Sequence, residues 1–408
     1  MSTPPTPPVG RILIFGPNHP SVNAGGSEHA AYALFCGLRD LGCDVRFLAM
    51  CRRSDAHRLV LAGPDEDVVL SDDGEYDGFY HLASPRLKAR ILAAIDAVQP
   101  AVVNFQHYLG IGANTIRDCA ALPGLRVVVT LHEYLAICNS EGQLLTRPQK
   151  SLCSGASPAA CVRCFPNTSP QEFAIRAETI KRNFAGVGAF VAPSQFLADT
   201  YVDWGLERGR IERIDNGLLE TPRRAALSRD DAAAVFGFFG QITPNKGVDL
   251  LVTAVELLAD SDFIGSVRIH GPLVGEARET LARLTDRSRL PRNVTYFGAY
   301  NNDQIGRLMA DCDYVVTPSI WWENDPVVIQ EAYAVGRPVI CANIGGMAEK
   351  VRHGQTGLHF RAGDPVDLAR VMLEAQAGRV RSTLQRQVPR PPTRTDMARG
   401  YLSLFSRL

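Results

Sequence analysis

The chain has 408 residues, of which 46% are hydrophobic and 21% are charged, a composition typical of a globular protein long enough for two domains. Lysine plus arginine and aspartate plus glutamate each number 43, so the zero net charge gives no support for a nucleic-acid partner. No segment approaches the ~20 apolar residues that a membrane-spanning helix needs. Residues 1–8 are Pro-rich and lack the apolar stretch of a signal peptide, so we expect a cytoplasmic protein.

The first half of the chain predicts alternating strands and helices. Short apolar runs predict strands at residues 11–15, 45–49, 101–105, 126–130 and 187–192. Between the first two runs lie a glycine-rich loop, with Gly25 and Gly26, and a helical pattern that Gly42 ends. Buried-type strands that alternate with helices indicate a parallel sheet covered on both faces, so we assign residues 9–216 to one domain.

Three polar residues directly follow predicted strands of this domain. Gln106 and His107 come after the strand at 101–105, and His132 comes after the strand at 126–130. Ligands of such sheets bind beyond the carboxyl ends of the strands, so Gln106 and His107 are candidates for lining an acceptor pocket. A lone histidine is often structural, but the place of His132 at a strand end favours a functional role.

Residues 138–164 form a cysteine-rich segment that we interpret as an insertion. This polar, turn-rich stretch holds Cys138, Cys153, Cys161 and Cys164. Four thiolates could hold a structural Zn²⁺, although their spacing is not that of a standard zinc finger. The alternative is four unrelated cysteines. Disulfides are disfavoured in a cytoplasmic protein.

Basic residues near the end of this domain interleave with Phe173, Ile180 and Phe184. These basic residues are Arg176, Lys181, Arg182, Arg208, Arg210 and Arg213. One interpretation is an amphipathic face for an anionic membrane, where lipid-linked acceptors would sit. The other, which we favour, is an ordinary surface helix with its apolar side in the core.

The alternation weakens at residues 217–233, which we interpret as a linker, and then restarts. Strands are predicted at residues 235–239, 267–270, 294–297, 314–317, 338–341 and 357–360. Residues 234–385 are therefore expected to form a second domain of the same class. The sequence thus predicts an α/β protein of two Rossmann-like, doubly wound domains that meet at a cleft.

The segment at residues 321–331 carries the strongest functional pattern. It follows a predicted strand and places Glu323 on the loop and Glu331 inside a helix, with Asp325 as the expected N-cap and Pro326 as the first helical residue. The two carboxylates could accept hydrogen bonds from sugar and ribose hydroxyls, beside a helix N-terminus suited to an anionic ligand. The alternative is that both glutamates are solvated acids without a function. The aromatic residues of the same loop favour a binding site.

This segment resembles the Glu-x7-Glu motif of retaining glycosyltransferases of the GT-B fold, in their large family four. Other segments are similar to motifs of that family and stand in the family's order, at residues 25–28, 214–217, 239–247 and 344–349. The resemblance covers nearly the whole chain. It implies two Rossmann-like domains facing across a cleft, with residues 386–408 packing back on the first domain.

The resemblance also implies roles for individual residues. Glu331 would bind the donor ribose and Glu323 the donor sugar hydroxyls, while His132 would reach the donor sugar across the cleft. Lys246 would neutralise the departing diphosphate, where a cation stabilises the charge that grows in the transition state. Further donor contacts, several through backbone N–H groups, would come from Gly25, Gly26, Gln241, Asn324, Asp325, Pro326 and Val327.

One position departs from the family pattern. The family usually has an arginine five residues before the lysine, where this chain has Gln241. Glutamine donates hydrogen bonds but carries no charge, so we expect weaker stabilisation of the phosphates at this place.

The expected activity is transfer of a sugar, with retention, from a nucleotide-diphosphate sugar to a hydroxyl of a saccharide or lipid-linked acceptor in bacterial polysaccharide or glycoconjugate biosynthesis. No cofactor or divalent cation would be required, because Lys246 and helix N-termini meet the diphosphate. Contact with the inner face of the membrane is an open alternative to a purely cytoplasmic place. The rival functions are a nucleotide-sugar 2-epimerase and a non-catalytic binding homologue, the latter encouraged only by Gln241.

Overall fold

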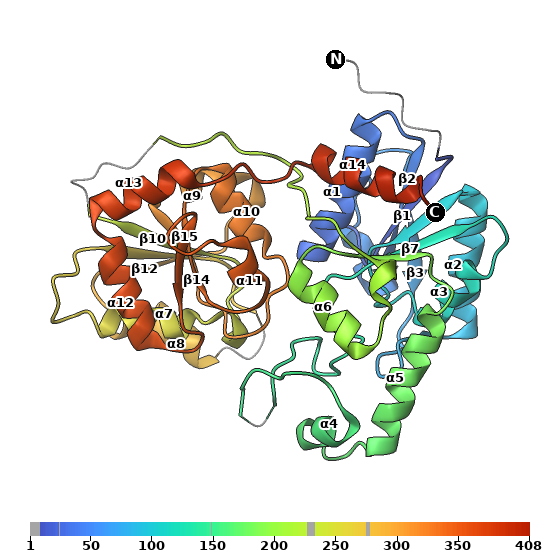
Figure 1. Ribbon diagram of the computed structural model, residues 1–408, viewed down its shortest axis with the longest axis horizontal. Coiled ribbons are helices and arrows are strands. Elements are labelled where there is room, and N and C mark those ends of the chain that lie inside the picture. Colours follow the sequence, from blue (N-terminus) through green and yellow to red (C-terminus); the bar gives the residue numbers. More distant parts are fainter. Residues whose placement is uncertain (1–8, 24, 148, 227–232, 275–277) are drawn as a thin grey trace. The chain divides into compact units, whose positions relative to one another are not determined.

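The computed structural model describes residues 9–23, 25–147, 149–226, 233–274 and 278–408 (Figure 1). Residues 1–8 and part of the predicted linker lie outside these ranges. The chain divides into two compact units. The N-terminal domain holds the residues up to Glu220 together with Pro392–Leu408, and the C-terminal domain holds Thr221–Pro391.

The N-terminal domain is built on a parallel sheet with the strand order β3-β2-β1-β6-β7-β8-β9. The strands are β1 (Ile12–Gly16), β2 (Val45–Arg52), β3 (Glu66–Ser71), β6 (Val102–Phe105), β7 (Arg126–Thr130), β8 (Ala189–Ala192) and β9 (Ile211–Arg213), with a separate antiparallel pair of β4 (Tyr76–Asp77) and β5 (Leu82–Ala83). The helices are α1 (Gly26–Asp40), α2 (Pro85–Val98), α3 (Ala113–Ala120), α4 (Pro158–Cys164), α5 (Pro170–Phe184), α6 (Gln195–Trp204) and α14 (Arg394–Phe405).

The C-terminal domain repeats this plan with the parallel strand order β12-β11-β10-β13-β14-β15. The strands are β10 (Val235–Phe239), β11 (Ser266–His270), β12 (Val294–Gly298), β13 (Tyr314–Thr317), β14 (Val339–Ala342) and β15 (Gly357–Phe360). The helices are α7 (Val248–Glu256), α8 (Arg278–Thr285), α9 (Ile305–Ala310), α10 (Val327–Ala334), α11 (Gly345–Lys350), α12 (Pro365–Ala375) and α13 (Gly378–Gln387).

The central strands are short and apolar because they are covered on both faces. Every residue of β6, β8, β13 and β14 is buried. A strand between two helix layers needs apolar side chains at successive positions, which is the run-like pattern seen in the sequence. Figure 1 shows each sheet flanked by helices. The predicted class of two doubly wound, Rossmann-like α/β domains is confirmed.

Besides the separate β4–β5 pair, the strands of this domain that the sequence did not predict lie at the edges of the N-terminal sheet. β3 and β9 are its outermost strands. β3 begins with two acidic residues, and β9 has only three residues, of which none is buried. An edge strand is paired on one side only and tolerates polar residues, so an apolar run is not needed to form it.

The last helix of the chain, α14, packs on α1 of the N-terminal domain, and the two lie side by side in Figure 1. Their contact is close at Gly37, where an added Cβ atom would lie 2.2 Å from the backbone oxygen of Arg394. The Arg394 guanidinium also bonds Asp40 at 2.6 Å, and Tyr401 is buried in the same core. The end of the chain is thus part of the N-terminal domain.

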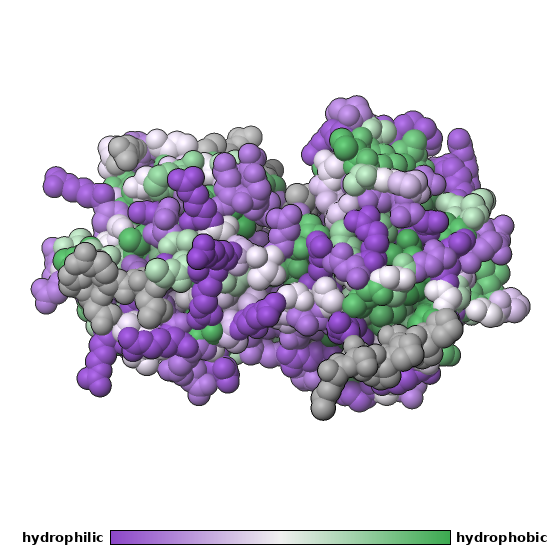
Figure 2. Space-filling view, turned by 90° about the horizontal axis from the view of Figure 1, so that it is seen from above, coloured by the Kyte–Doolittle hydropathy of each residue, from purple (hydrophilic) through white to green (hydrophobic). Residues whose placement is uncertain are grey.

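Helix α5 turns its apolar residues inward. Phe173, Ile180 and Phe184 are buried, and Arg176 lies among the buried residues as well. The apolar side of this helix therefore faces the core, as in the ordinary surface helix that we favoured, and contact with a membrane stays a prediction. Among the described residues, no helix has both the length and the apolar character to span a bilayer. On the face drawn in Figure 2, hydrophilic residues cover much of the surface and hydrophobic ones show in separate patches.

Strand order reverses at one point in each sheet. In the N-terminal domain β1 pairs with both β2 and β6, and in the C-terminal domain β10 pairs with both β11 and β13. The loops that leave the carboxyl ends of the strands diverge at such a switch point and leave room for a ligand. The residues predicted to be functional follow β1, β6 and β7 in one domain and β10 and β13 in the other.

Candidate functional site

Two loops of the C-terminal domain are fastened together beside its switch point. The loop after β10 carries Lys246 at the end of a short 3₁₀ turn (Pro244–Lys246), and the loop after β13 carries Glu323. Ile320 N–H donates to the Asn245 oxygen at 2.9 Å. Gly247 has a φ of 71°, and an added Cβ would lie 2.0 Å from the Pro318 oxygen, so only glycine allows this approach.

Glu323 is held by three donors that converge on one of its oxygens. Oε1 accepts hydrogen bonds from Lys246 Nζ at 2.5 Å, Ser319 Oγ at 2.8 Å and Trp321 Nε1 at 3.0 Å. Glu323 is 6% exposed, so these three donors replace the water molecules that would otherwise stabilise the carboxylate. The described residues make no hydrogen bond to Oε2. One carboxylate oxygen is therefore fixed by the protein and the other can accept a hydrogen bond from a ligand.

Lys246 is less buried than its partner. Its side chain is 32% exposed, and Nζ lies 5.6 Å from the centre of the Trp321 ring. An ammonium group has three N–H bonds and uses one on Glu323. A second anionic group arriving from solvent can therefore bind the same nitrogen without displacing the ion pair.

The loop that carries Glu323 is also fixed to the start of α11. Gly346 N–H donates to the Glu323 backbone oxygen at 2.8 Å. An added Cβ on Gly346 would lie 1.4 Å from the Asn324 oxygen, a contact that no side chain permits. The two-glycine sequence at 345–346 thus serves the close approach of two backbone segments.

Asp325 does not cap α10 as predicted. The N-cap is Pro326, and no side chain caps the helix. The buried Asp325 carboxylate instead accepts hydrogen bonds from Gln330 Nε2 at 3.1 Å and lies 3.3 Å from Lys350 Nζ. The prediction that donor contacts come from the backbone N–H groups of 324–327 also needs correction at one position, because proline has no N–H.

Glu331 lies on α10 without a polar partner for its side chain. Among the described residues, none donates a hydrogen bond to this carboxylate or forms an ion pair with it. Burial raises the pKa of Glu331 to about 7. Burial also raises the pKa of Tyr300, and the charge of Glu331 adds to that rise, so the two side chains are neighbours. A half-buried acid without a partner is costly, and ligand hydroxyl groups would satisfy it.

Gln241 lies on the loop after β10 and is exposed. Within the described part of the chain, its side chain makes no hydrogen bond. The residue that replaces the family arginine is therefore not held in place by its surroundings.

In the N-terminal domain, the glycine loop after β1 is held by Glu28. Gly25 is the N-cap of α1 and Gly26 its first residue. The buried Glu28 carboxylate accepts hydrogen bonds from Asn23 Nδ2 and Ser27 Oγ, both at 2.8 Å. An added Cβ on Gly26 would meet no atom within 4 Å, so this glycine is not required by packing within the protein.

His132 is bonded to Gln106 at the carboxyl ends of β7 and β6. His132 Nε2 lies 3.0 Å from Gln106 Oε1, and both residues are largely enclosed. Burial, with a smaller effect of His107, lowers the pKa of His132 to about 3. The ring is therefore neutral at physiological pH. It can accept or donate a hydrogen bond, but it does not supply a positive charge.

His107 is bonded on both ring nitrogens. Its Nδ1 accepts from the backbone N–H groups of Tyr108 and Leu109, each at 2.9 Å, so Nε2 carries the hydrogen and donates to Glu133 Oε1 at 3.1 Å. Gln106 and His107 are thus both buried and bonded inside the domain. Their direct contact with an acceptor stays a prediction, and the structure gives them a supporting place beside His132 and Glu133.

Two family models match this chain, one on each domain. Glycosyltransferase Family 4 matches residues 24–218, and Glycosyl transferases group 1 matches residues 221–386. Together the two matches cover most of the chain. The chain belongs to the group 1, family-4 glycosyltransferases.

Curated relatives match the chain over shorter stretches. A D-inositol 3-phosphate glycosyltransferase of Mycolicibacterium gilvum is 33% identical over 145 residues, which are 35% of this chain and 32% of the relative. One of Rhodococcus opacus is 36% identical over 140 residues, which are 33% of this chain and 31% of the relative. The chain thus matches about a third of the length of these curated relatives.

Solved structures resemble the glycosyltransferase over nearly its whole length. HepE of Anabaena, solved in complex with UDP and glucose, has a TM-score of 0.68 at 19% identity and covers 98% of this chain and 100% of its own. Sucrose-phosphate synthase of Thermosynechococcus elongatus has a TM-score of 0.74 at 17% identity and covers 98% of each chain. The GT-B fold class predicted from the sequence is confirmed.

The cysteine-rich insertion is the segment in which the sequence predicted a zinc site. All four cysteines are free thiols, and in the described residues no three His, Cys, Asp or Glu side chains are arranged to hold a metal ion. Cys153 Sγ donates to the Gly155 oxygen at 3.2 Å, and Cys164 Sγ accepts from Arg147 N–H at 3.5 Å. The first of these bonds is local, and the second spans 17 positions. Cys138, Cys153 and Cys164 each add to the rise in the pKa of Cys161 that burial causes, so the four thiols lie near one another, and the zinc site stays a prediction.

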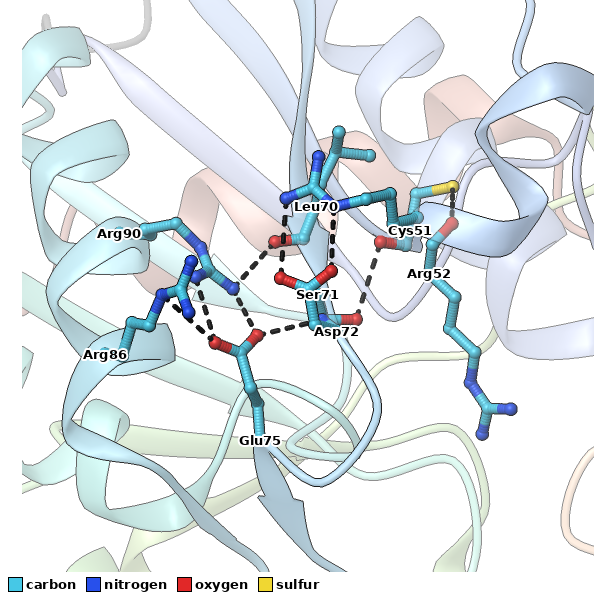
Figure 3. A network of polar contacts seen from close by, with 9 residues as sticks. Cys51, Arg52, Leu70, Ser71, Asp72, Glu75, Arg86 and Arg90 are labelled. Atoms are coloured by element: carbon cyan, nitrogen blue, oxygen red, sulfur yellow. Dashed lines mark hydrogen bonds and ion pairs between the residues drawn. The ribbon is translucent and has the colours of Figure 1, made fainter.

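Arginines and carboxylates of the N-terminal domain form a network of polar contacts (Figure 3). Arg90 bonds Glu75 at 3.0 Å, and Arg53 bonds Asp72 at 2.7 Å. The bond from Arg53 lowers the pKa of Asp72, and the bond from Arg90 lowers the pKa of Glu75. Arg86 lies 3.8 Å from Glu75. These arginines are neutralised by their neighbours, which argues against a binding site for an anion here.

Several residues that hold the site were missed from the sequence. Ser319 and Trp321 bond Glu323 from within the motif's own loop, where a polar residue next to a functional carboxylate is a usable signal. Lys350 directly follows the segment at residues 344–349 and could have been found in the same way. Thr130 ends a predicted strand, but its bond to Tyr401 spans 271 positions and leaves no local pattern.

Proposed function

We propose that this protein transfers a sugar, with retention of the anomeric configuration, from a nucleotide-diphosphate sugar to a hydroxyl group of a saccharide or lipid-linked acceptor. The observation that carries the proposal is the convergence of Lys246, Trp321 and Ser319 on one oxygen of Glu323 at the switch point of the C-terminal sheet. This arrangement offers a cation and an open carboxylate oxygen side by side, which suits a ligand with both phosphates and hydroxyls.

The proposed roles in the C-terminal domain follow from these contacts. Glu331, a half-buried acid without a polar partner in the described residues, accepts hydrogen bonds from the ribose hydroxyls of the donor. Glu323 Oε2 accepts a hydrogen bond from a hydroxyl of the transferred sugar. Lys246 keeps one N–H on Glu323 and directs the others to the diphosphate. His132, neutral and fixed by Gln106, is proposed to bond the transferred sugar.

The proposed reaction is a substitution on one face of the sugar ring. The bond between the anomeric carbon and the phosphate oxygen breaks, and the acceptor oxygen bonds to the same face of that carbon. The acceptor proton passes to an oxygen of the departing diphosphate. Negative charge grows on that diphosphate, and Lys246 stabilises it. In this scheme the protein supplies no nucleophile, and the lysine takes the part that a divalent cation plays in other transferases.

The donor class and the biological setting rest on the similar structures. HepE was solved in complexes with UDP and glucose and with UDP-glucose, so UDP-sugars are the first donors to test. Another similar structure is the lipopolysaccharide outer core galactosyltransferase WaaB, with a TM-score of 0.65 at 14% identity. We therefore propose a cytoplasmic role in assembling a bacterial polysaccharide or glycoconjugate.

A binding experiment tests the donor site first. Thermal melting is measured against a panel of nucleoside diphosphates and nucleotide sugars for the wild type, for Glu331→Ala and for Glu374→Ala, whose carboxylate is exposed on α12. We expect one nucleotide to raise the melting temperature by mass action in the wild type and in Glu374→Ala, but not in Glu331→Ala. Stabilisation that survives in Glu331→Ala would contradict the ribose role.

A turnover experiment with EDTA present then tests the reaction. The coupling constant of the anomeric proton, followed by NMR, reports the configuration of the product. Retention without added metal is expected. Inversion, or a strict need for a divalent cation, would overturn the proposed mechanism. Epimerised donor in the absence of acceptor would identify a 2-epimerase, and binding without any turnover of the panel would identify a non-catalytic homologue.

A further inference from the structure

A buried chain of hydrogen bonds runs from the last helix of the protein to His132. Tyr401 on α14 lies 2.9 Å from Thr130 Oγ1 at the end of β7. Thr130 Oγ1 lies 3.2 Å from Gln106 Nε2, and Gln106 Oε1 lies 3.0 Å from His132 Nε2. Tyr401, Thr130 and Gln106 are each about 1% exposed, so water does not compete for these bonds.

The hydrogen of the Thr130 hydroxyl has one well-placed acceptor. Thr130 Oγ1 already accepts two N–H groups, from Gln106 at 3.2 Å and from Asn104 at 3.1 Å. A hydroxyl has one hydrogen and two lone pairs, so both lone pairs are in use. The hydrogen then points to Tyr401, because the other acceptor within reach, Asn104 Oδ1, is 3.5 Å away.

This direction fixes the Gln106 amide. Its nitrogen faces two oxygens, those of Thr130 and Asn104, and its oxygen is therefore turned toward His132. An amide oxygen only accepts hydrogen bonds, so His132 Nε2 must carry the ring hydrogen. His132 is neutral and holds a single ring hydrogen, so the whole network selects one of its two tautomers.

We propose that Tyr401 is a positioning residue that, by receiving the Thr130 hydrogen, holds the Gln106 amide in one orientation and His132 in its Nε2–H tautomer. The last helix of the chain thereby sets the state of a residue at the carboxyl end of the N-terminal sheet. The consequence for turnover rests on the proposed function, in which His132 bonds the transferred sugar. The consequence for the tautomer does not.

Removing the Tyr401 hydroxyl should allow the Gln106 amide to take both orientations. In Tyr401→Phe the ring still fills the core, but the Thr130 hydrogen turns to Asn104 Oδ1, the oxygen that accepts from Gln106 in the wild type. The Gln106 amide can then rotate and present its nitrogen to His132. A mixture of Nδ1–H and Nε2–H tautomers follows. Thr130→Val should loosen the amide by another route, because it removes one of the two oxygens that the Gln106 nitrogen faces. Thr130→Ser, which keeps the hydroxyl, should behave like the wild type.

The tautomer is read from ¹⁵N shifts of the full-length protein labelled on histidine, with the His132 signal assigned by its loss in His132→Gln. We expect Nε2–H in the wild type and in Thr130→Ser, and a mixture in Tyr401→Phe and Thr130→Val. Tyr314→Phe is the matched control, because it removes a buried phenol that bonds the Ala375 oxygen at 3.0 Å in the other domain. It should leave His132 unchanged. Pure Nε2–H in both Tyr401→Phe and Thr130→Val would overturn the proposal.

Kinetics give a second reading. We expect kcat to fall about five- to tenfold in Tyr401→Phe, the factor carried by one misdirected hydrogen bond, with the donor KM unchanged. The double variant Tyr401→Phe/Thr130→Val should be no slower than either single one, since both break the same chain. A fall in kcat equal to that of Tyr314→Phe would count against a positioning role. A wild type inactive with every donor would defeat the proposed function, while the tautomer measurement would still decide this inference.

Discussion

The two domains hold their candidate residues by different means. In the C-terminal domain the contacts are ionic: Lys246 bonds Glu323 at 2.5 Å, and Lys350 lies 3.3 Å from Asp325. In the N-terminal domain His132 is held by an amide, which is itself held by hydroxyl groups, and none of these groups is charged at neutral pH. Glu323 is thus held by charge, and His132 by the direction of hydrogen bonds between neutral groups.

This difference matches what each domain would have to bind. A diphosphate brings negative charge, and a site for it needs a cation that is kept in place before the ligand arrives. A neutral hydroxyl group needs only a hydrogen-bond partner in the right direction. A histidine with a pKa of about 3 is neutral and can bond this hydroxyl without adding a charge. The comparison predicts that charge-removing variants will damage the C-terminal site most, while the N-terminal site will respond to small changes of hydrogen-bond geometry.

The largest effect is expected from Lys246→Met. Loss of the cation should lower kcat by about 100- to 1000-fold, the range for removing one group that stabilises transition-state charge. It should also lower the melting temperature, because the buried Glu323 carboxylate loses its counter-ion. Steady-state kinetics and thermal melting measure the two effects.

A surface lysine and a double variant separate these causes. Lys88→Met removes an ion pair with Asp118 of 2.6 Å in the N-terminal domain and should change neither property by much. Lys246→Met/Glu323→Gln removes the unpaired charge and should recover stability without recovering kcat. Recovery of kcat in the double variant would mean that Lys246 serves only to neutralise Glu323.

A smaller effect is expected from a pair of glycine variants, one in each domain. Gly346→Ala places a Cβ 1.4 Å from the Asn324 oxygen and must move the loop that carries Glu323, whereas Gly26→Ala meets no atom within 4 Å. We expect Gly346→Ala to cost about 1–3 kcal/mol of unfolding free energy, as strained substitutions do, and Gly26→Ala to cost less than about 0.5 kcal/mol. Chemical denaturation measures both.

Activity sharpens the same comparison. Gly26→Ala should fold like the wild type and yet lower kcat if the donor phosphates approach that backbone, as the family resemblance implies. Unchanged kcat in Gly26→Ala would remove this glycine from the proposed site. A Gly346→Ala variant as stable as the wild type would contradict the packing argument for the two-glycine segment.

The sequence predicted the parts of this fold that depend on local pattern. Apolar runs gave the buried strands, and Glu323 and Glu331 stood out because a strand, a loop and a helix follow one another there. What it could not give are bonds between distant segments. Tyr401 bonds Thr130, 271 positions away, because α14 packs on α1, and no periodicity in the sequence predicts that contact.

Local rules also failed where tertiary contacts overrode them. Asp325 has the residue type and position of an N-cap, but its carboxylate contacts Lys350 and Gln330 instead of the helix N-terminus. Residue type suggests a role, and the partners that the fold delivers decide it.

The smallest effect that separates the domains is a dependence of donor affinity on pH. Glu331 has a pKa of about 7, raised by burial above its usual 4.5, so it gains its charge between pH 6 and pH 8. The folded protein holds this proton more tightly than the unfolded chain, so the stability contributed by the protonated form is lost as pH rises from about 4.5 to 7. The ionised carboxylate is the better acceptor for ribose hydroxyls, so nucleotide binding should strengthen between pH 6 and pH 8.

If only the ionised form binds well, the dissociation constant should fall about tenfold between pH 6 and pH 8, in proportion to the ionised fraction. Isothermal titration calorimetry of the wild type and of Glu331→Gln measures this. Titration of the nucleotide's own phosphate contributes equally to both proteins and cancels in the comparison. His132, with a pKa of about 3, stays neutral throughout this range and should add no slope, so His132→Gln should follow the wild-type curve. A slope that persists in Glu331→Gln and vanishes in His132→Gln would reverse the assignment of charged and neutral roles to the two domains.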